Sequence, residues 1–323
     1  MDSVAKEVES ELLPFLRVYK DGSVERLIGS PIVPASIEDP ETGVSSKDIT
    51  ISQDPPISAR LYLPKFTEPN QKLAVLFYCH GGGFCIESAF SLTETKYMNS
   101  LVSLAKVVAI SVEYRLAPEH PLSVVYEDCW VALQWVAMHS DKNELENKDP
   151  WIFNHGDFSR LFIGGDSAGA NIAHNMVMKV GSEGLKSDIK LLGAYLTHPY
   201  FWGSKAVGSE STIEREQHLP YRVWSFLYPS APGGIDNSMI NPVAPGAPSL
   251  AGLGGSRLLI SVAEKDELRE RGILYYNVVK ESGWKGEIQL IEVEGEDHAF
   301  HILNFETEKA KNLIKRLASF LLN

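Results

Sequence analysis

Residues 160–171 read Arg-Leu-Phe-Ile-Gly-Gly-Asp-Ser-Ala-Gly-Ala-Asn, and this stretch decides the fold. The apolar run Arg160–Ile163 predicts a buried strand, and the residues from Ala168 onward predict a helix. Between them, Gly165-x-Ser167-x-Gly169 has the pattern of a sharp strand-to-helix turn that exposes a serine at its tip. The two glycines suit such a turn because a side chain at either position would collide with neighbouring backbone. We therefore predict a nucleophilic Ser167, with a glycine-rich turn without chemistry as the alternative.

The rest of the chain alternates short apolar runs with longer amphipathic stretches. The predicted strands are Leu73–Cys79, Lys106–Val112, Arg160–Ile163, Ile189–Leu196, Arg257–Val262 and Glu287–Glu292. The predicted helices are Val124–Met138, Ala168–Val180, Leu268–Ser282 and Phe305–Leu322. Strands rich in Val, Ile and Leu that alternate with helices are typical of a mostly parallel sheet covered on both faces. The sequence therefore predicts an α/β fold.

Two regions interrupt this alternation. Residues 1 to about 50 are polar and rich in proline turns. Residues 198–256 carry aromatic side chains, among them Trp202, Tyr221, Trp224, Phe226 and Tyr228, and end in a loop rich in proline and glycine. Aromatic segments inserted between sheet elements commonly fold over a binding site. We therefore expect the second region to form a lid, and an aromatic-rich connector is the alternative.

The first predicted strand leads into His80-Gly81-Gly82-Gly83-Phe84. Successive glycines let the backbone bend so that amide hydrogens point into a cavity instead of pairing in a sheet. We predict that the amides of Gly82 and Gly83, together with that of Ala168, stabilise a developing oxyanion. His80 is expected to hold this loop rather than to exchange protons. The side chains that follow the glycines, Phe84, Cys85 and Ile86, are predicted to line an apolar substrate pocket.

A serine nucleophile needs a base, and the base needs a carboxylate. The chain order expected for this architecture is serine, acid, histidine. Asp266 and His298 follow the last two predicted strands, so both are expected at the sheet edge where such sites form. A neutral imidazole would accept the serine proton, and the carboxylate would fix its tautomer. Glu264 and Glu267 are rival acids and His301 is a rival base, while Asp266 could instead cap the helix that follows.

Composition excludes several classes of function. The chain has 323 residues and a net charge of -12, which disfavours nucleic acid and anionic membrane partners. The acidic N-terminus does not resemble a signal peptide, and no apolar run is long enough to span a membrane. Three irregularly spaced cysteines predict neither a disulfide framework nor a zinc site. We expect a cytoplasmic protein without metal or cofactor that acts on a small molecule, as a monomer or homodimer.

With these features the chain resembles the plant carboxylesterases of the hormone-sensitive-lipase group, which have the α/β-hydrolase fold. The motifs that carry the resemblance span nearly the whole length: Val18-Tyr19-Lys20-Asp21-Gly22, His80-Gly81-Gly82-Gly83-Phe84, Tyr114-Arg115-Leu116-Ala117-Pro118-Glu119-His120-Pro121, Gly165-Asp166-Ser167-Ala168-Gly169 and Asp297-His298-Ala299-Phe300. The resemblance implies one hydrolase domain over residues 1–323, with cap elements from about 1–50 and 198–250. It implies a triad of Ser167, Asp266 and His298 that cleaves a small apolar ester.

The same family contains proteins that are not esterases. Gibberellin receptors are similar to this chain but lack the triad histidine, so His298 counts against a hormone receptor. The 2-hydroxyisoflavanone dehydratases and certain alkaloid-forming cyclases use the same scaffold for elimination or rearrangement. The dehydratases of legumes typically carry threonine at the nucleophile position, where this chain has Ser167. The intact triad and glycines favour hydrolysis, and an elimination or cyclisation stays the alternative.

Overall fold

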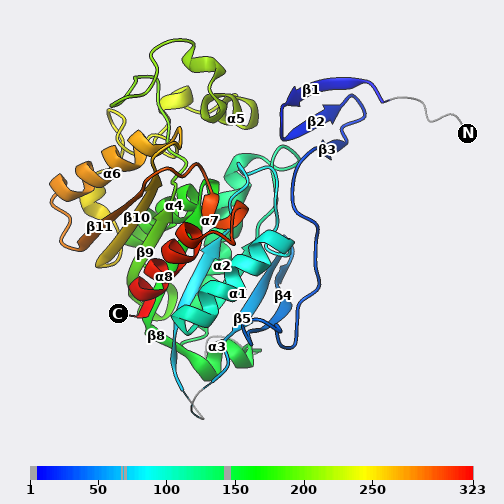
Figure 1. Ribbon diagram of the computed structural model, residues 1–323, viewed down its shortest axis with the longest axis vertical. Helices are drawn as coiled ribbons and strands as arrows, with labels where there is room; N and C mark the ends of the chain where they lie inside the picture. The colour runs from blue at the N-terminus through cyan, green and yellow to red at the C-terminus, as the bar shows by residue number, and fades with distance from the viewer. Residues whose placement is uncertain (1–5, 67, 69–70, 142–146, 323) are drawn as a thin grey trace, which may run out of the picture.

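A large mixed sheet runs through the centre of the molecule (Figure 1). The structure is a computed structural model that describes residues 6–66, 68, 71–141 and 147–322. Within these residues, eight strands form one sheet in the order β11-β10-β9-β8-β6-β7-β5-β4. Strands β6 to β11 run parallel, whereas β5 pairs antiparallel with both β7 and β4. The bounds are Ser45–Gln53 (β4), Pro56–Leu63 (β5), Leu73–Cys79 (β6), Val107–Glu113 (β7), Gly156–Asp166 (β8), Leu191–Thr197 (β9), Arg257–Ala263 (β10) and Glu287–Val293 (β11).

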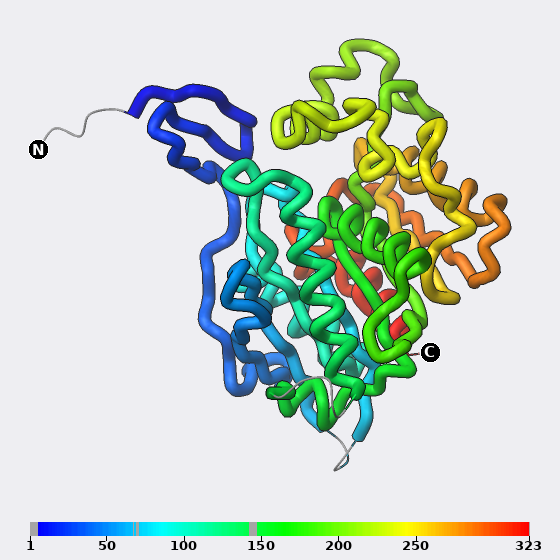
Figure 2. Tube along the Cα trace, turned by 180° about the vertical axis from the view of Figure 1, so that it is seen from behind, coloured from blue at the N-terminus to red at the C-terminus, as the bar shows by residue number. Residues whose placement is uncertain are grey.

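Helices cover both faces of this sheet, which confirms the predicted α/β architecture (Figures 1 and 2). Helices α1 and α8 pack together on one face, and α2 and α4 pack against each other on the other, where α6 covers β10 and β11. The bounds are Leu92–Ala105 (α1), Leu122–Met138 (α2), Pro150–His155 (α3), Ala168–Glu183 (α4), Leu219–Leu227 (α5), Arg269–Glu281 (α6), Phe300–Leu303 (α7) and Glu308–Leu322 (α8). No helix in the described part of the chain is long and apolar enough to cross a membrane.

The six predicted strands are all present, with ends that differ by a few residues. The largest difference is β8, which begins at Gly156 rather than at Arg160 because polar residues at its start still pair with β6. Strands β4 and β5 and helix α1 were not predicted. Helix α1 follows the glycine loop and buries Tyr97, Met98, Leu101 and Val102. The helical spacing of these residues would have allowed the helix to be predicted.

Two segments lie beyond the carboxyl ends of the parallel strands. The N-terminal residues form a separate three-stranded sheet, and α5 in the aromatic-rich region contacts its first strand. Figure 1 shows this small sheet and α5 as neighbours above the main sheet, although they are far apart in sequence. The small strands are Val8–Leu12 (β1), Leu16–Tyr19 (β2) and Val24–Arg26 (β3), and the short 3-10 turns are Lys186–Asp188 (η1), Arg215–Gln217 (η2), Gly234–Asp236 (η3) and Leu250–Gly252 (η4).

Candidate active site

Ser167 stands at the tip of the turn between β8 and α4. Its backbone has φ 51° and ψ −118°, a conformation that non-glycine residues adopt only where the surrounding structure enforces it. The flanking glycines are required by space. A Cβ at Gly165 would lie 2.3 Å from the carbonyl oxygen of Gly169, and a Cβ at Gly169 would lie 2.0 Å from that of Cys79. The tight turn therefore holds the serine hydroxyl above the sheet edge, as the glycine spacing predicts.

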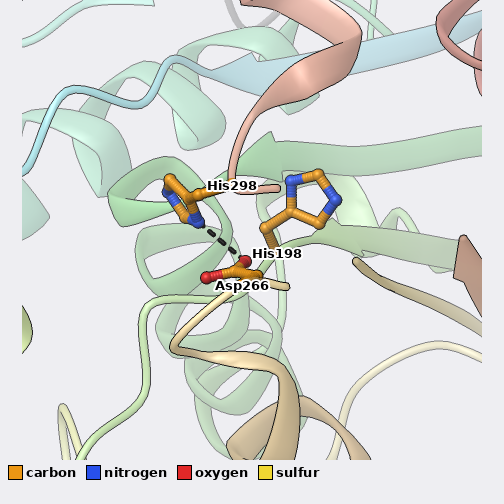
Figure 3. Close-up of side chains that lie close together, drawn as sticks. All are labelled: His198, Asp266 and His298. Carbon is orange, nitrogen blue, oxygen red and sulfur yellow. Dashed lines mark hydrogen bonds and ion pairs between the residues drawn. The ribbon is translucent and has the colours of Figure 1, made fainter. Parts of the chain in front are cut away.

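The structure brings Asp266 and His298 together with this serine. Nε2 of His298 lies 2.8 Å from the Ser167 hydroxyl oxygen, and Nδ1 lies 2.8 Å from Oδ2 of Asp266. Figure 3 shows the imidazole and the carboxylate pointing toward each other from the loops after β11 and β10. The other oxygen of Asp266 accepts the N–H of Leu268 at 2.9 Å. Asp266 therefore serves both the imidazole and the start of α6, two roles that the sequence treats as alternatives.

The electrostatics of the pair suit proton transfer. Burial opposes protonation of His298, but the charge of Asp266 and its hydrogen bond outweigh burial and raise the pKa of the imidazole above its usual value. Burial alone would raise the pKa of Asp266, but the charge and hydrogen bond of His298 lower it. Asp266 therefore remains ionised at neutral pH and stabilises an imidazolium.

A second histidine, His198, lies beside this pair and was not singled out in the sequence. The ligand atoms of His198, Asp266 and His298 all lie within 4.8 Å of one another, close enough in principle to hold a metal ion (Figure 3). However, both ring nitrogens of His298 are engaged in the hydrogen bonds above, and Nδ1 of His198 accepts the N–H of Ala299 at 3.0 Å. Burial and the neighbouring imidazoles lower the pKa of His198 well below its usual value. This donor set is better suited to orienting His298 than to binding a cation.

The glycine loop faces the serine from the end of β6. Gly82 and Gly83 have φ values of 93° and 58°, and a Cβ at Gly82 would lie 2.3 Å from the carbonyl oxygen of Ile86. Among the described residues, no backbone carbonyl accepts the amide of Gly82 or of Gly83. The amide of Ala168 opens α4, and the first amides of a helix have no partner within it. Three amides are therefore available to an anion at this place.

The neighbouring His80 is fully buried, as expected for a residue that holds the loop. Its ring stacks on Tyr114 with ring centroids 4.2 Å apart, and the Tyr114 hydroxyl donates to the His80 carbonyl at 2.8 Å. Burial lowers the pKa of His80 to about 4, so its ring is neutral at physiological pH.

Two cavities meet at Ser167 and His298. The first, of about 240 Å³, reaches toward the aromatic-rich region and is lined by Leu219, Pro220 and Val223. The second, of about 340 Å³, reaches toward α1 and α7. Phe15 of the N-terminal segment and Gly83 line both. Both cavities are thus closed in part by the segments for which the sequence predicts a cap.

The predicted pocket residues divide between these cavities and the core. Ile86 lines the second cavity, as expected. Phe84 and Cys85 line neither cavity. The positive φ of 64° at Phe84 accompanies a fully buried ring that packs against Tyr126 and Tyr200, and Cys85 is equally buried. Phe15 and Val223 also contribute to the apolar walls, and both are too distant in sequence from the glycine loop to be found by motif.

The rival residues have other surroundings or partners, although Glu267 also lines the first cavity. His301 is fully buried, its ring packs against Tyr97 and His198, and neither of its nitrogens has a hydrogen-bond partner among the described residues. Glu264 accepts the amide of Gly295 at 2.7 Å, and Glu267 bonds with His218. None of these three contacts the serine.

Comparison with known proteins gives consistent results. Residues 76–302 match a family described as having the alpha/beta hydrolase fold. A 2-hydroxyisoflavanone dehydratase from Glycyrrhiza echinata is 57% identical over 99% of this chain and 98% of its own, and the probable carboxylesterase 2 of Arabidopsis thaliana is 42% identical over the same shares. A hyperthermophilic esterase from the archaeon Pyrobaculum calidifontis superposes with a TM-score of 0.66 at 27% identity, covering 91% of this chain and 86% of that one.

Proposed function

Because this chain belongs to the α/β-hydrolase fold family and is an enzyme of its esterase group, we propose that it is a serine carboxylesterase. The observation that carries the proposal is the unbroken hydrogen-bond chain from the Ser167 hydroxyl through His298 to Asp266. It lies where two largely apolar cavities meet, so that an ester carbonyl between them would have room for one arm on each side.

The reaction is acyl transfer in two steps. Oγ of Ser167 attacks the ester carbonyl carbon while Nε2 of His298 accepts the serine proton. The carbonyl oxygen becomes an oxyanion against the amides of Gly82, Gly83 and Ala168, and each such donor lowers the barrier by roughly 3 kcal/mol in comparable sites. When the tetrahedral intermediate collapses, the bond to the alcohol oxygen breaks and His298 protonates that oxygen. Water, deprotonated by the same imidazole, then releases the acid and regenerates the serine.

Labelling of the nucleophile tests this proposal. An organophosphate should add its phosphoryl mass to the peptide that contains Ser167, and Ser167→Ala should abolish both labelling and hydrolysis of an aryl acetate. Circular dichroism and thermal unfolding of the variant should match the wild type, because the buried hydroxyl faces the two cavities rather than the packed core. Retained turnover in the folded variant, or labelling at another residue, would refute the assignment.

The second candidate function is elimination of water, because a 2-hydroxyisoflavanone dehydratase is 57% identical to this chain. The same imidazole could remove a proton next to a carbonyl while the three amides stabilise the resulting enolate. The enolate would then expel the hydroxyl group from the adjacent carbon, and His298 would return its proton to that oxygen, which leaves as water. The two reactions differ in whether the serine becomes acylated. Rapid quenching during turnover of a slow ester should trap an acyl group on Ser167, and efficient dehydration by Ser167→Ala without any acyl-enzyme would favour elimination.

We further propose that the protein acts in the cytoplasm on a small molecule, as a monomer or homodimer. Its three cysteines are buried as free thiols, which suits a reducing compartment. Fractionation of cells and light scattering of the purified protein test these two expectations.

A further inference from the structure

The second cavity combines apolar walls with an acidic floor. Ile86 and Ile302 contribute to its walls, and three carboxyl side chains, Glu87, Glu94 and Asp166, also line it. Among its described lining residues there is no lysine or arginine to balance these carboxyls. The mechanism proposed above does not use any of the three.

Two of these carboxyl side chains have hydrogen-bond partners that explain why they lie in the cavity wall. Asp166 accepts the hydroxyl of Tyr78 at 2.5 Å. Glu87 is half-buried and accepts the amide of Ser30 at 3.0 Å, which ties the N-terminal segment to the cavity. Both side chains therefore support the local structure.

Glu94 is different. Its place three residues after Ser91 is typical of a capping box, in which the glutamate would accept the amide of the capping residue. Here the amide of Ser91 donates to the carbonyl of Ser88 at 3.0 Å instead. The Glu94 side chain is turned inward, is only 2% exposed, and leaves Oε2 buried without a partner among the described residues. A buried polar atom without a partner costs about 1–3 kcal/mol, so this geometry requires an explanation.

The charge state of Glu94 narrows what it can bind. Burial raises the pKa of this carboxyl well above its usual value, and the charges of Asp166 and Glu87 raise it further, while a hydrogen bond with the Tyr78 side chain offsets part of the rise and leaves Oε2 without a partner among the described residues. Burial also raises the pKa of Asp166. A neutral carboxyl offers one O–H donor and a carbonyl acceptor, which together match a hydroxyl group. A carboxylate ligand would be repelled by the neighbouring acids, and an apolar ligand would leave Oε2 unpaired.

We propose that the second cavity is a subsite for a substrate arm that carries a hydroxyl group, and that Glu94 is the residue that hydrogen-bonds this hydroxyl. The substrate class then becomes an ester, as in the proposed function, with an apolar arm that ends in a hydroxyl. Glu94 acts here on specificity and does not take part in the acyl transfer itself.

Matched substrate pairs test the proposal. One pair varies the acyl arm, p-nitrophenyl 3-(4-hydroxyphenyl)propanoate against p-nitrophenyl 3-phenylpropanoate, and the other varies the alcohol arm, 2-(4-hydroxyphenyl)ethyl acetate against 2-phenylethyl acetate. The wild type should favour the hydroxylated member by about tenfold in kcat/KM in at least one pair, the discrimination that a buried hydrogen bond gives. Glu94→Leu should reduce this ratio to about one, and Glu94→Gln should restore part of the preference.

Several results would overturn the proposal. These are equal rates within both pairs in the wild type, a hydroxyl preference that survives in folded Glu94→Leu, and a stronger preference for a trimethylammonium arm, which would indicate a charged carboxylate.

A protection experiment tests the subsite in the wild type, without a variant. In this experiment 4-ethylphenol should protect Ser167 from organophosphate labelling at lower concentration than ethylbenzene does, and equal protection would contradict the proposal. This readout does not require ester turnover. An enzyme that is inert toward all esters but is protected by the phenol would refute the esterase and retain the subsite.

Discussion

Replacing Asp266 by asparagine should separate the two jobs that this carboxylate performs. Its two oxygens accept different N–H groups, with Oδ1 bound to Leu268 at 2.9 Å and Oδ2 facing Nδ1 of His298 at 2.8 Å. An asparagine amide has only one oxygen. If that oxygen keeps the Leu268 amide, the NH2 group faces His298 and donates to Nδ1, which forces the proton onto Nε2. An imidazole that carries its proton on Nε2 cannot accept the proton of Ser167.

The expected loss follows from this tautomer change. Asp266→Asn should lower kcat for an aryl acetate by about ten-thousand-fold, or about 5 kcal/mol, the magnitude that loss of the correct tautomer causes in serine hydrolases. The start of α6 keeps its hydrogen bond, so the thermal midpoint should change little. Stopped-flow assay of hydrolysis, with active sites counted by organophosphate titration, provides the measurement.

A matched control comes from the rival carboxylate in the same loop. Glu264 is exposed and accepts the amide of Gly295, so Glu264→Gln should keep kcat within about threefold of the wild type. The reasoning fails if Asp266→Asn retains more than a tenth of wild-type kcat, or if the two variants lose activity equally.

Three further predictions concern protonation, packing and the cap. Catalysis needs neutral His298, whose pKa is raised above 6.5, so kcat/KM of the wild type should fall with decreasing pH through a midpoint above 6.5. The residual activity of Asp266→Asn should fall through a lower midpoint. A wild-type midpoint below pH 6.5 would contradict the charge pairing of His298 with Asp266. Gly169→Ala would put a Cβ 2.0 Å from backbone oxygen, so it should destabilise the fold by at least about 1–3 kcal/mol, and an unchanged denaturant midpoint argues against the tight turn. Val223→Trp should fill the first cavity, so kcat/KM for long-chain esters should fall relative to that for acetates, and an unchanged chain-length profile would remove that cavity from the binding path.

Most of the fold was predictable because local physics governs the elements concerned. Four of the parallel strands, β6, β7, β9 and β10, are nearly continuous apolar runs buried on both faces, a pattern that few other arrangements accommodate. Strand β4 escaped prediction because it is an edge strand in which polar residues alternate with apolar ones. Strand β5 lies inside the sheet, but Ser58 and Arg60 interrupt its apolar run, and it follows a stretch that otherwise resembles a proline-rich loop. The strands of the N-terminal sheet are too short to show a clear alternation of apolar and polar residues.

The sequence by itself determined which residue types were candidates for chemistry: the serine in its glycine turn, the glycine loop, and a carboxylate and a histidine after successive strands. The order of these features along the chain reflects the order of strands, and parallel strands end at a common edge, so convergence at that edge was foreseeable. Only the tertiary structure decided the distances within this group, the burial of Phe84, and the contributions of Phe15, Val223, His198 and Glu94 around it. Those contributions depend on how two cap segments and α1 pack over the sheet. Such packing is a balance of many contacts between residues distant in sequence, and no local pattern encodes it.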